Sequence, residues 1–336
     1  MKRTAYLCLI VIALGMGTPP TVIAADSDEI DVIGHRGARS VLPENTLPAF
    51  AHALAAGVDA LELDVGLSRD GVVVVAHDRS PHPAFTRDAS GEWLSPDQAR
   101  PLITYDYEEL RKFDVGRLKP GSKYAGRFPD QQPVDGTPMP TLQEVIALAR
   151  KAGNDTVRFD VELKRNPDKP EETRDPEPFA RAVLDVLRKE GVLGRAVIQS
   201  FDWSVLAAVK KLAPEVPRSY LTAQFRSLNT IQKGRPDTSA WTGGLDIDDY
   251  GGSVPQLVKA AGGTIWSAYH LKLNAKVVRE ARALGLTIYA WTVNTPEDLH
   301  RMVDLQVDGI ITDYPKHLRA VLTVRGYKLP KPTPVE

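Results

Sequence analysis

The stretch from Leu61 to Asp78 reads LELDVGLSRDGVVVVAHD and contains two apolar runs that predict β-strands. The first run carries Glu62 and Asp64, which point to the same face because side chains alternate along a strand. Such a pair could line the solvent side of an edge strand, but the alternating leucine and valine residues occupy the other face. Two carboxylates on a buried face are costly unless a cation or hydrogen bonds compensate them. We therefore predict a metal or substrate site at the end of this strand.

The connection between these two predicted strands, Gly66 to Gly71, is too short for a crossover helix. It allows either a hairpin around Asp70-Gly71 or an extended crossover, because residues at about 3.3 Å each can span a short strand. His77 ends the second strand. If the carboxylates and this histidine belong to one face of the sheet, the crossover is the consistent choice.

Strand and helix patterns alternate along the rest of the chain and predict about nine strands for the eight places of a TIM-type barrel. Polar residues follow the first, middle and last of these strands: His35, Arg36, Glu162, Lys164, Trp291 and Asp313. An open doubly wound sheet gathers ligands at a switch point between a few strands. A closed barrel instead brings the ends of all strands together, the first beside the last. We therefore predict a TIM-type (β/α)8 barrel with an insertion after the third strand.

The segments outside this alternation set the domain boundaries. Residues 79–140 lose the periodicity and are rich in proline, glycine and aromatic residues, which favours a folded insertion over disorder. Residues 26–326 are predicted to form a single barrel domain that includes this insertion. Residues 327–336 contain three prolines and are predicted to be a disordered tail.

The first 25 residues have the pattern of a secretory signal peptide: Lys2 and Arg3 precede a short apolar run, and small residues follow. The single cysteine, Cys8, lies inside this segment. We expect a periplasmic or secreted protein without a disulfide or a stable membrane anchor. The formal net charge of -1 among 336 residues gives no indication of nucleic-acid binding.

Two of the seven histidines, His35 and His77, directly end predicted strands. His270 follows another strand at a short distance and is the alternative candidate. A pair of imidazoles can act as base and acid near neutral pH. We predict that His35 and His77 are the catalytic residues.

Glu162 adds a third carboxylate to Glu62 and Asp64, and Lys164 follows Glu162 on the same face of its strand. An all-oxygen, anionic set suits Ca²⁺ or Mg²⁺ better than zinc, and we predict one divalent cation here. The alternative is that Glu162 and Lys164 form an ordinary surface ion pair. Arg36 and Lys164 would supply positive charge to an anionic substrate.

Taken together, seven motifs in this order resemble the glycerophosphodiester phosphodiesterase family, in the form of its exported, insertion-containing members. They span Ile30 to Pro315 apart from the insertion. They are His35-Arg36-Gly37, Pro43-Glu44-Asn45-Thr46, Glu62-x-Asp64, Asp70-Gly71 through His77-Asp78, Glu162-Leu163-Lys164, Trp291-Thr292-Val293-Asn294 and Asp308-Gly309-Ile310-Ile311-Thr312-Asp313.

The resemblance implies a TIM barrel that hydrolyses glycerophosphodiesters to sn-glycerol 3-phosphate and an alcohol. By position it implies three metal ligands, two catalytic histidines, three substrate-binding residues and two supporting residues: Glu62, Asp64 and Glu162; His35 and His77; Arg36, Lys164 and Trp291; Glu44 and Asn45. The attacking oxygen could come from water or from the substrate's own glycerol hydroxyl through a cyclic phosphate.

Two other functions remain open at this point. A related barrel enzyme acting on lysophospholipids would have the same site residues. An exported protein that binds phosphodiesters without turnover would be indicated by the loss of a histidine or an acid, and none is lost. The preferred alcohol and the oligomeric state stay open.

Overall fold

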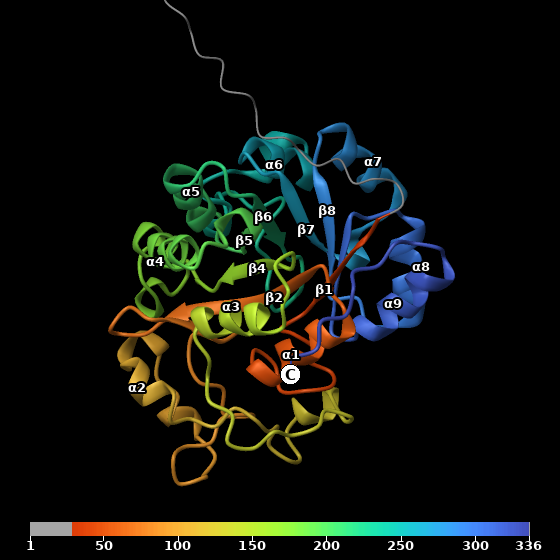
Figure 1. Cartoon of the computed structure of the whole chain (residues 1–336). Helices are drawn as coiled ribbons and strands as arrows, with labels where there is room; N and C mark the ends of the chain where they lie inside the picture. The colour runs from red at the N-terminus through yellow and green to blue at the C-terminus, as the bar shows by residue number, and fades with distance from the viewer. Residues whose placement is uncertain (1–28, 336) are drawn as a thin grey trace, which may run out of the picture.

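The computed structural model describes residues 29–335 (Figure 1), so the predicted signal peptide lies outside the described residues. Eight parallel strands form a closed barrel in the order β1-β9-β8-β7-β6-β5-β4-β2, and pairing of β1 with β2 closes the ring. This confirms the predicted TIM barrel. The barrel strands are β1 (Asp31–Gly34), β2 (Ala60–Leu67), β4 (Arg158–Leu163), β5 (Ala196–Ser200), β6 (Arg218–Thr222), β7 (Ile265–Tyr269), β8 (Thr287–Trp291) and β9 (Gly309–Thr312).

Helices surround the barrel, and the apolar core lies mainly between them and the outer face of the strands (Figure 1). The α-helices of the described chain are α1 (Leu47–Ala56), α2 (Tyr107–Leu110), α3 (Leu142–Lys151), α4 (Pro176–Lys189), α5 (Trp203–Leu212), α6 (Val254–Ala260), α7 (Ala275–Ala283), α8 (Pro296–Asp304) and α9 (Pro315–Val324). A smaller apolar cluster that includes Ile33, Tyr289 and Ile311 fills the barrel interior.

Helix α1 begins after Thr46 and ends at Gly57. The Thr46 hydroxyl accepts a hydrogen bond from the Ala49 backbone N–H (3.4 Å), and Gly57 ends the helix with a left-handed φ of 82°. Gly37 also has a positive φ, and a Cβ there would lie 2.6 Å from the Ala49 backbone. The loop after β1 can therefore pack against α1 only with glycine at position 37.

The connection from β2 to β3 (Val73–Val75) is a hairpin, so the crossover we favoured is wrong. Strand β3 runs antiparallel to β2 outside the ring. The Ser68 hydroxyl accepts a hydrogen bond from the Val72 N–H (2.9 Å), and Gly71 adopts the left-handed φ of 82° that this tight turn requires. The returning chain then bonds through the Ala76 N–H to the Asp64 carbonyl (2.9 Å). Because β2 extends past the ring, the hairpin still returns His77 to the level of the carboxylates.

The insertion, residues 79–140, is folded, as the aromatic content predicts. It contains α2 and the short 3-10 helices η1 (Pro96–Gln98), η2 (Leu102–Thr104) and η3 (Ala125–Arg127). It packs on β3 through a core of its own that includes Val74, Leu102, Tyr105 and Leu110. In Figure 1 this orange-to-yellow segment lies beside α1 and α3, at one side of the barrel.

The tail beyond Gly326 is ordered through Val335, and the prediction of a disordered tail is wrong. The Thr333 N–H donates to the Leu54 carbonyl (2.9 Å), and Arg319 Nη1 donates to the Pro330 carbonyl (2.9 Å). Leu329 packs against the main core. Prolines restrict the unfolded chain to extended conformations, so docking this extended segment costs less conformational entropy.

We predict that deleting residues 327–336 destabilises the barrel. The deletion exposes apolar surface under Leu329 and removes the partners of Leu54 and Arg319, and we expect the free energy of unfolding to fall by about 1–3 kcal/mol. Thermal and urea unfolding of the two proteins measure this change. An unchanged unfolding midpoint would show that the tail contributes nothing to the fold.

Candidate active site

Three buried carboxylates lie at the carboxyl ends of two adjacent barrel strands. Glu62 and Asp64 point inward from β2, and Glu162 points inward from β4, where it is the register partner of Asp64. Each offers an oxygen, and these three oxygens all lie within 4.8 Å of one another. The alternation along the two strands thus brings together the acids that the sequence predicted as a metal site.

The donor chemistry of this triad fits a hard divalent cation. All three groups are carboxylates, which suit Ca²⁺ or Mg²⁺. Asp64 Oδ1 is buried and accepts no hydrogen bond from residues 29–335, and Lys164 Nζ lies 3.5 Å from it. Buried carboxylate oxygens are rarely left in this state. A cation bound here would give that oxygen a partner.

Mutual repulsion of the triad is visible in the pKa values of its members. Burial and the neighbouring Asp64 and Glu162 raise the pKa of Glu62 well above its usual range. Burial and Asp64 raise the pKa of Glu162 to about 7, although Lys164 acts in the opposite direction. Burial also opposes ionisation of Asp64, but Arg36, His77, Lys164 and the Asn45 hydrogen bond together outweigh burial and lower the pKa of Asp64 well below the usual value. Without a cation, the site therefore holds one firmly ionised carboxylate and two that resist ionisation.

The loop after β1 supports the triad from one side. Arg36 Nη1 donates to Glu44 Oε1 (2.6 Å), and Arg36 Nε lies 3.2 Å from Asp64 Oδ2. The Asn45 side chain donates to the same Asp64 oxygen (2.9 Å). Arg36 and Asn45 adopt left-handed φ values of 50° and 57°, which are strained for residues other than glycine. The backbone N–H of Arg36 holds this conformation by donating to Glu62 Oε2 (2.9 Å).

His35 ends β1 and is held by a carboxylate from the last strand of the barrel. Its Nδ1 lies 2.6 Å from Asp313 Oδ1, which leaves Nε2 directed toward Glu62 Oε2 at 3.9 Å. Arg39 binds Asp313 with two nitrogens (3.0 and 2.9 Å), and Asn294 donates to it as well (2.7 Å). Burial and Arg39 lower the pKa of His35 to about 4, against the opposing effect of Asp313. The imidazole is therefore fixed in orientation, and its surroundings favour the neutral form.

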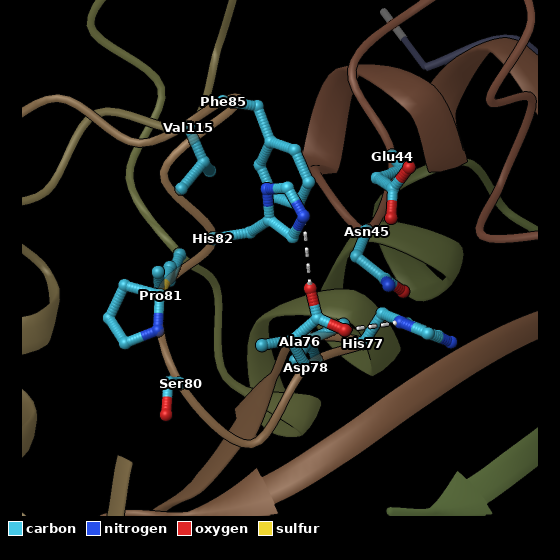
Figure 2. Close-up of a pocket in the computed structure, with 12 residues that line it drawn as sticks. Glu44, Asn45, Ala76, His77, Asp78, Ser80, Pro81, His82, Phe85 and Val115 are labelled. Carbon is cyan, nitrogen blue, oxygen red and sulfur yellow. Dashed lines mark hydrogen bonds and ion pairs between the residues drawn. The ribbon is translucent and has the colours of Figure 1, made fainter. Parts of the chain in front are cut away.

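His77 follows β3 and has a carboxylate partner too. Its Nδ1 lies 2.9 Å from Asp78 Oδ1, and the other Asp78 oxygen lies 3.9 Å from His82 Nε2. Figure 2 shows the Asp78 carboxylate between the two imidazoles. His82 stacks on Phe85 of the insertion with ring centroids 4.7 Å apart. Burial, followed by Arg36 and Lys164, lowers the pKa of His77.

Most of the residues that the sequence predicted as site residues line a single pocket. Seven of them line it: His35, Arg36, Glu62, His77, Glu162, Lys164 and Trp291. Asp64, Glu44 and Asn45 are buried beside them: Glu44 and Asp64 form ion pairs with Arg36, and the Asn45 amide donates to Asp64. The alternative candidate His270 lies elsewhere, where its ring contacts Arg301 (3.1 Å) and Asp298 (3.5 Å).

Sequence reasoning missed four polar or aromatic residues of this pocket: Arg39, Arg127, Gln199 and Phe201. Gln199 had a detectable signal, because it lies on the inward face of β5 beside Glu162, and its amide donates to Glu62 (2.9 Å). Phe201 follows that strand and contacts Trp291 edge to face, at 5.5 Å between ring centroids. Arg127 comes from the insertion, where no periodic pattern indicates which side chain faces the barrel.

A TIM barrel whose strand ends gather acids, histidines and cations in one pocket has the architecture of an enzyme active site. A comparison with protein families matches residues 35–317 to the glycerophosphoryl diester phosphodiesterase family, and the chain belongs to this family. It is therefore a phosphoric diester hydrolase of the TIM-barrel type. Within residues 29–335, none of the helices has the length and apolar character needed to cross a membrane.

The relatives and solved structures agree with this assignment. The chain is 29% identical over 291 residues to a glycerophosphodiester phosphodiesterase of Caldanaerobacter subterraneus subsp. tengcongensis, covering 85% of this chain and 95% of that protein. A crystal structure from Silicibacter pomeroyi, assigned as a glycerophosphoryl diester phosphodiesterase, is 38% identical with a TM-score of 0.80, covering 90% of this chain and 96% of that one. A phosphodiesterase of Oleispira antarctica, solved with the product sn-glycerol-3-phosphate, has the same fold at 21% identity and a TM-score of 0.62, covering 87% of this chain and 96% of that one.

We predict that Ca²⁺ or Mg²⁺ binds at the triad and stabilises the folded protein. A cation at 100 times its dissociation constant adds about 2.7 kcal/mol to the free energy of unfolding. Glu62→Gln removes one ligand charge and should abolish the cation-induced rise in melting temperature, whereas Glu92→Gln at an exposed position should retain it. Equal shifts for both variants would place the cation elsewhere.

Proposed function

We propose that this enzyme hydrolyses glycerophosphodiesters to sn-glycerol 3-phosphate and an alcohol, with one divalent cation, Ca²⁺ or Mg²⁺, and with His35 and His77 as acid and base. One observation carries the proposal. Both imidazoles line the pocket of the carboxylate triad, and each is held through Nδ1 by an aspartate, so that each Nε2 remains available. A phosphodiester bound at the triad would then have a proton acceptor and a proton donor within one pocket.

Displacement at phosphorus needs two proton transfers, one from the attacking oxygen and one to the leaving oxygen. One histidine accepts the proton of the attacking hydroxyl while the new P–O bond forms. The other histidine, in its protonated form, donates its Nε2 proton to the leaving alkoxide as the ester P–O bond breaks. Attacking and leaving oxygens lie roughly opposite each other in such a displacement, so the two groups must act from different sides of the phosphate. The two histidines follow separate strands, His35 after β1 and His77 after β3, which supports that arrangement.

Charge at the phosphate requires compensation by the surrounding groups. We assign Glu62, Asp64 and Glu162 as the ligands of the cation, which when bound supplies positive charge that stabilises the transition state. Arg36 and Lys164 are the proposed phosphate-binding residues. Both are buried or nearly so beside the triad, with Lys164 Nζ 2.6 Å from Glu162. A divalent cation bound at the triad would neutralise part of its negative charge. Arg36 and Lys164 could then interact with a phosphate oxygen.

The remaining predicted residues have supporting or substrate-contacting roles in this proposal. Glu44 and Asn45 hold Arg36 and Asp64 in place through the contacts described above. Trp291 is half-buried at the pocket, and its indole N–H donates to the Ser267 carbonyl (3.1 Å), so the ring is fixed in orientation. We assign it to contact with the organic part of the substrate.

We also infer that the enzyme acts outside the cytoplasm, in the periplasm or as a secreted protein. The support is the signal-peptide pattern of residues 1–25.

Product analysis tests the proposed reaction directly. With glycerophosphocholine and Ca²⁺ or Mg²⁺, we expect equimolar sn-glycerol 3-phosphate and choline, loss of turnover with a chelator, and recovery when the cation is restored. Hydrolysis of lysophosphatidylcholine in its place would identify the related lysophospholipid activity. Tight binding of the diester without products, or full activity of protein shown to be free of metal, would contradict the proposal.

We predict that His35→Asn and His77→Asn each lower kcat by about 10²–10⁴ while the fold and cation binding persist. A glycerol phosphodiester with a nitrophenol leaving group needs little protonation. One variant should therefore recover most of its rate on that substrate and the other should not, which identifies the acid. Equal losses of both variants on both substrates would contradict divided acid and base roles.

A further inference from the structure

Arg127 is the one residue of the insertion's η3 segment that lines the active-site pocket. Its side chain is exposed at the pocket edge, whereas His35, Glu62 and Glu162 are buried. The insertion therefore contributes a cation to the outer part of a pocket whose inner part belongs to the barrel. Residues that approach a substrate from such a position contact its peripheral groups more than its reacting phosphate.

The charge state of the pocket sets Arg127 apart from the other lining cations. Arg36 is paired with Glu44 and Asp64, Arg39 with Asp313, and Lys164 with Glu162 and Asp64. Arg127 forms no ion pair with any carboxylate of residues 29–335, and its guanidinium contacts aromatic rings only. Among the lining cations of the described chain, it is the one whose charge is not already neutralised.

The Arg127 side chain is positioned by rings that are themselves anchored to the barrel. Its guanidinium lies 5.5 Å from the Tyr124 ring centroid and 5.6 Å from that of Phe128, within cation–π range. The Tyr124 hydroxyl donates to Glu44, the partner of Arg36. The Arg39 guanidinium also lies over the Phe128 ring, 4.7 Å from its centroid.

Two hydrogen bonds to backbone carbonyls complete this attachment of the insertion. Gln131 Nε2 donates to the Arg39 carbonyl (2.6 Å), and the Gln132 N–H donates to the Val41 carbonyl (2.8 Å). Both acceptors belong to the loop after β1 that carries the site residues. Arg127 is thus fixed relative to the active site by the same loop that supports Arg36.

We propose that Arg127 binds a second anionic group, a carboxylate or a phosphate, on the alcohol part of the substrate. This inference rests on the proposed function and specifies its substrate class. The buried groups of the inner pocket already account for the scissile phosphate, and an unpaired guanidinium at the edge forms charge-assisted hydrogen bonds with a further oxyanion. Phe201, Leu221 and Trp291, which line the same pocket, offer no charge to such a group.

Three diesters of sn-glycerol 3-phosphate with matched alcohols test the inference: 3-hydroxypropanoate, propane-1,3-diol and choline, which end in an anion, a neutral group and a cation. The readout is the ratio of kcat/KM between the anionic and the neutral diester. We expect Arg127→Gln to lower this ratio about tenfold, between the effect of an exposed ion pair and that of a charge-assisted hydrogen bond. Arg127→Lys should retain part of the preference.

Lys112→Gln is the matched control, because it removes one positive charge from an exposed position of the insertion outside the pocket. We expect it to leave the ratio unchanged. An unchanged ratio in Arg127→Gln, or an equal loss on all three diesters, would overturn the inference. If the wild-type enzyme hydrolysed none of them, the proposed function itself would fail. Calorimetric binding of the same three diesters would then still decide whether Arg127 selects the anionic one.

Discussion

The burial of three carboxylates in one small volume is the constraint that determines the rest of the site. Glu62, Asp64 and Glu162 repel one another in surroundings that solvate charge poorly, and the folded chain must compensate this repulsion. It does so in part with Arg36 and Lys164, both within ion-pair distance of Asp64. The compensation is incomplete, because Asp64 retains a buried oxygen to which no group of the described chain, residues 29–335, donates a hydrogen bond. Such incomplete neutralisation by protein groups favours binding of a cation and, after it, of a phosphate.

Barrel closure and the β2–β3 hairpin bring the histidines to this charge cluster by different routes. Closure sets the end of β1 beside the end of β9, which is how Asp313 comes to hold His35 although 278 residues separate them. The hairpin works because β2 extends beyond the ring and gives β3 an edge for pairing, so the chain turns back and delivers His77 from outside. Both rings are held through Nδ1 by an aspartate. The imidazoles of His35 and His77 therefore reach one pocket from different directions.

Part of this arrangement could be predicted from the sequence, because side chains two residues apart on a strand lie on the same face. The acids at i and i+2 of β2 had to share a face, and polar residues after both the first and last strands favoured a closed ring. That the acid of β4 lies on the same inner face is fixed by the register of β2 with β4, which the structure provides. The direction of β3 could not be predicted, because it depends on how far β2 extends past the ring. The tail after Gly326 was mistaken for disorder because its docking depends on long-range contacts such as Thr333 with Leu54. The position of Arg127 at the pocket could not be predicted for a similar reason, because it depends on the fold of the insertion and not on a periodic sequence pattern.

The central claim is that one cation at the triad and one phosphate between the two histidines form the reactive complex. A crystal structure with Ca²⁺ and sn-glycerol 3-phosphate, with the cation identified by its anomalous signal, tests this most directly. The account predicts a cation about 2.3–2.6 Å from oxygens of Glu62, Asp64 and Glu162, the range usual for calcium. It also predicts a phosphate within hydrogen-bond distance of Nε2 of His35 and of His77. A cation bound away from the triad, or a phosphate that contacts neither imidazole, would contradict it.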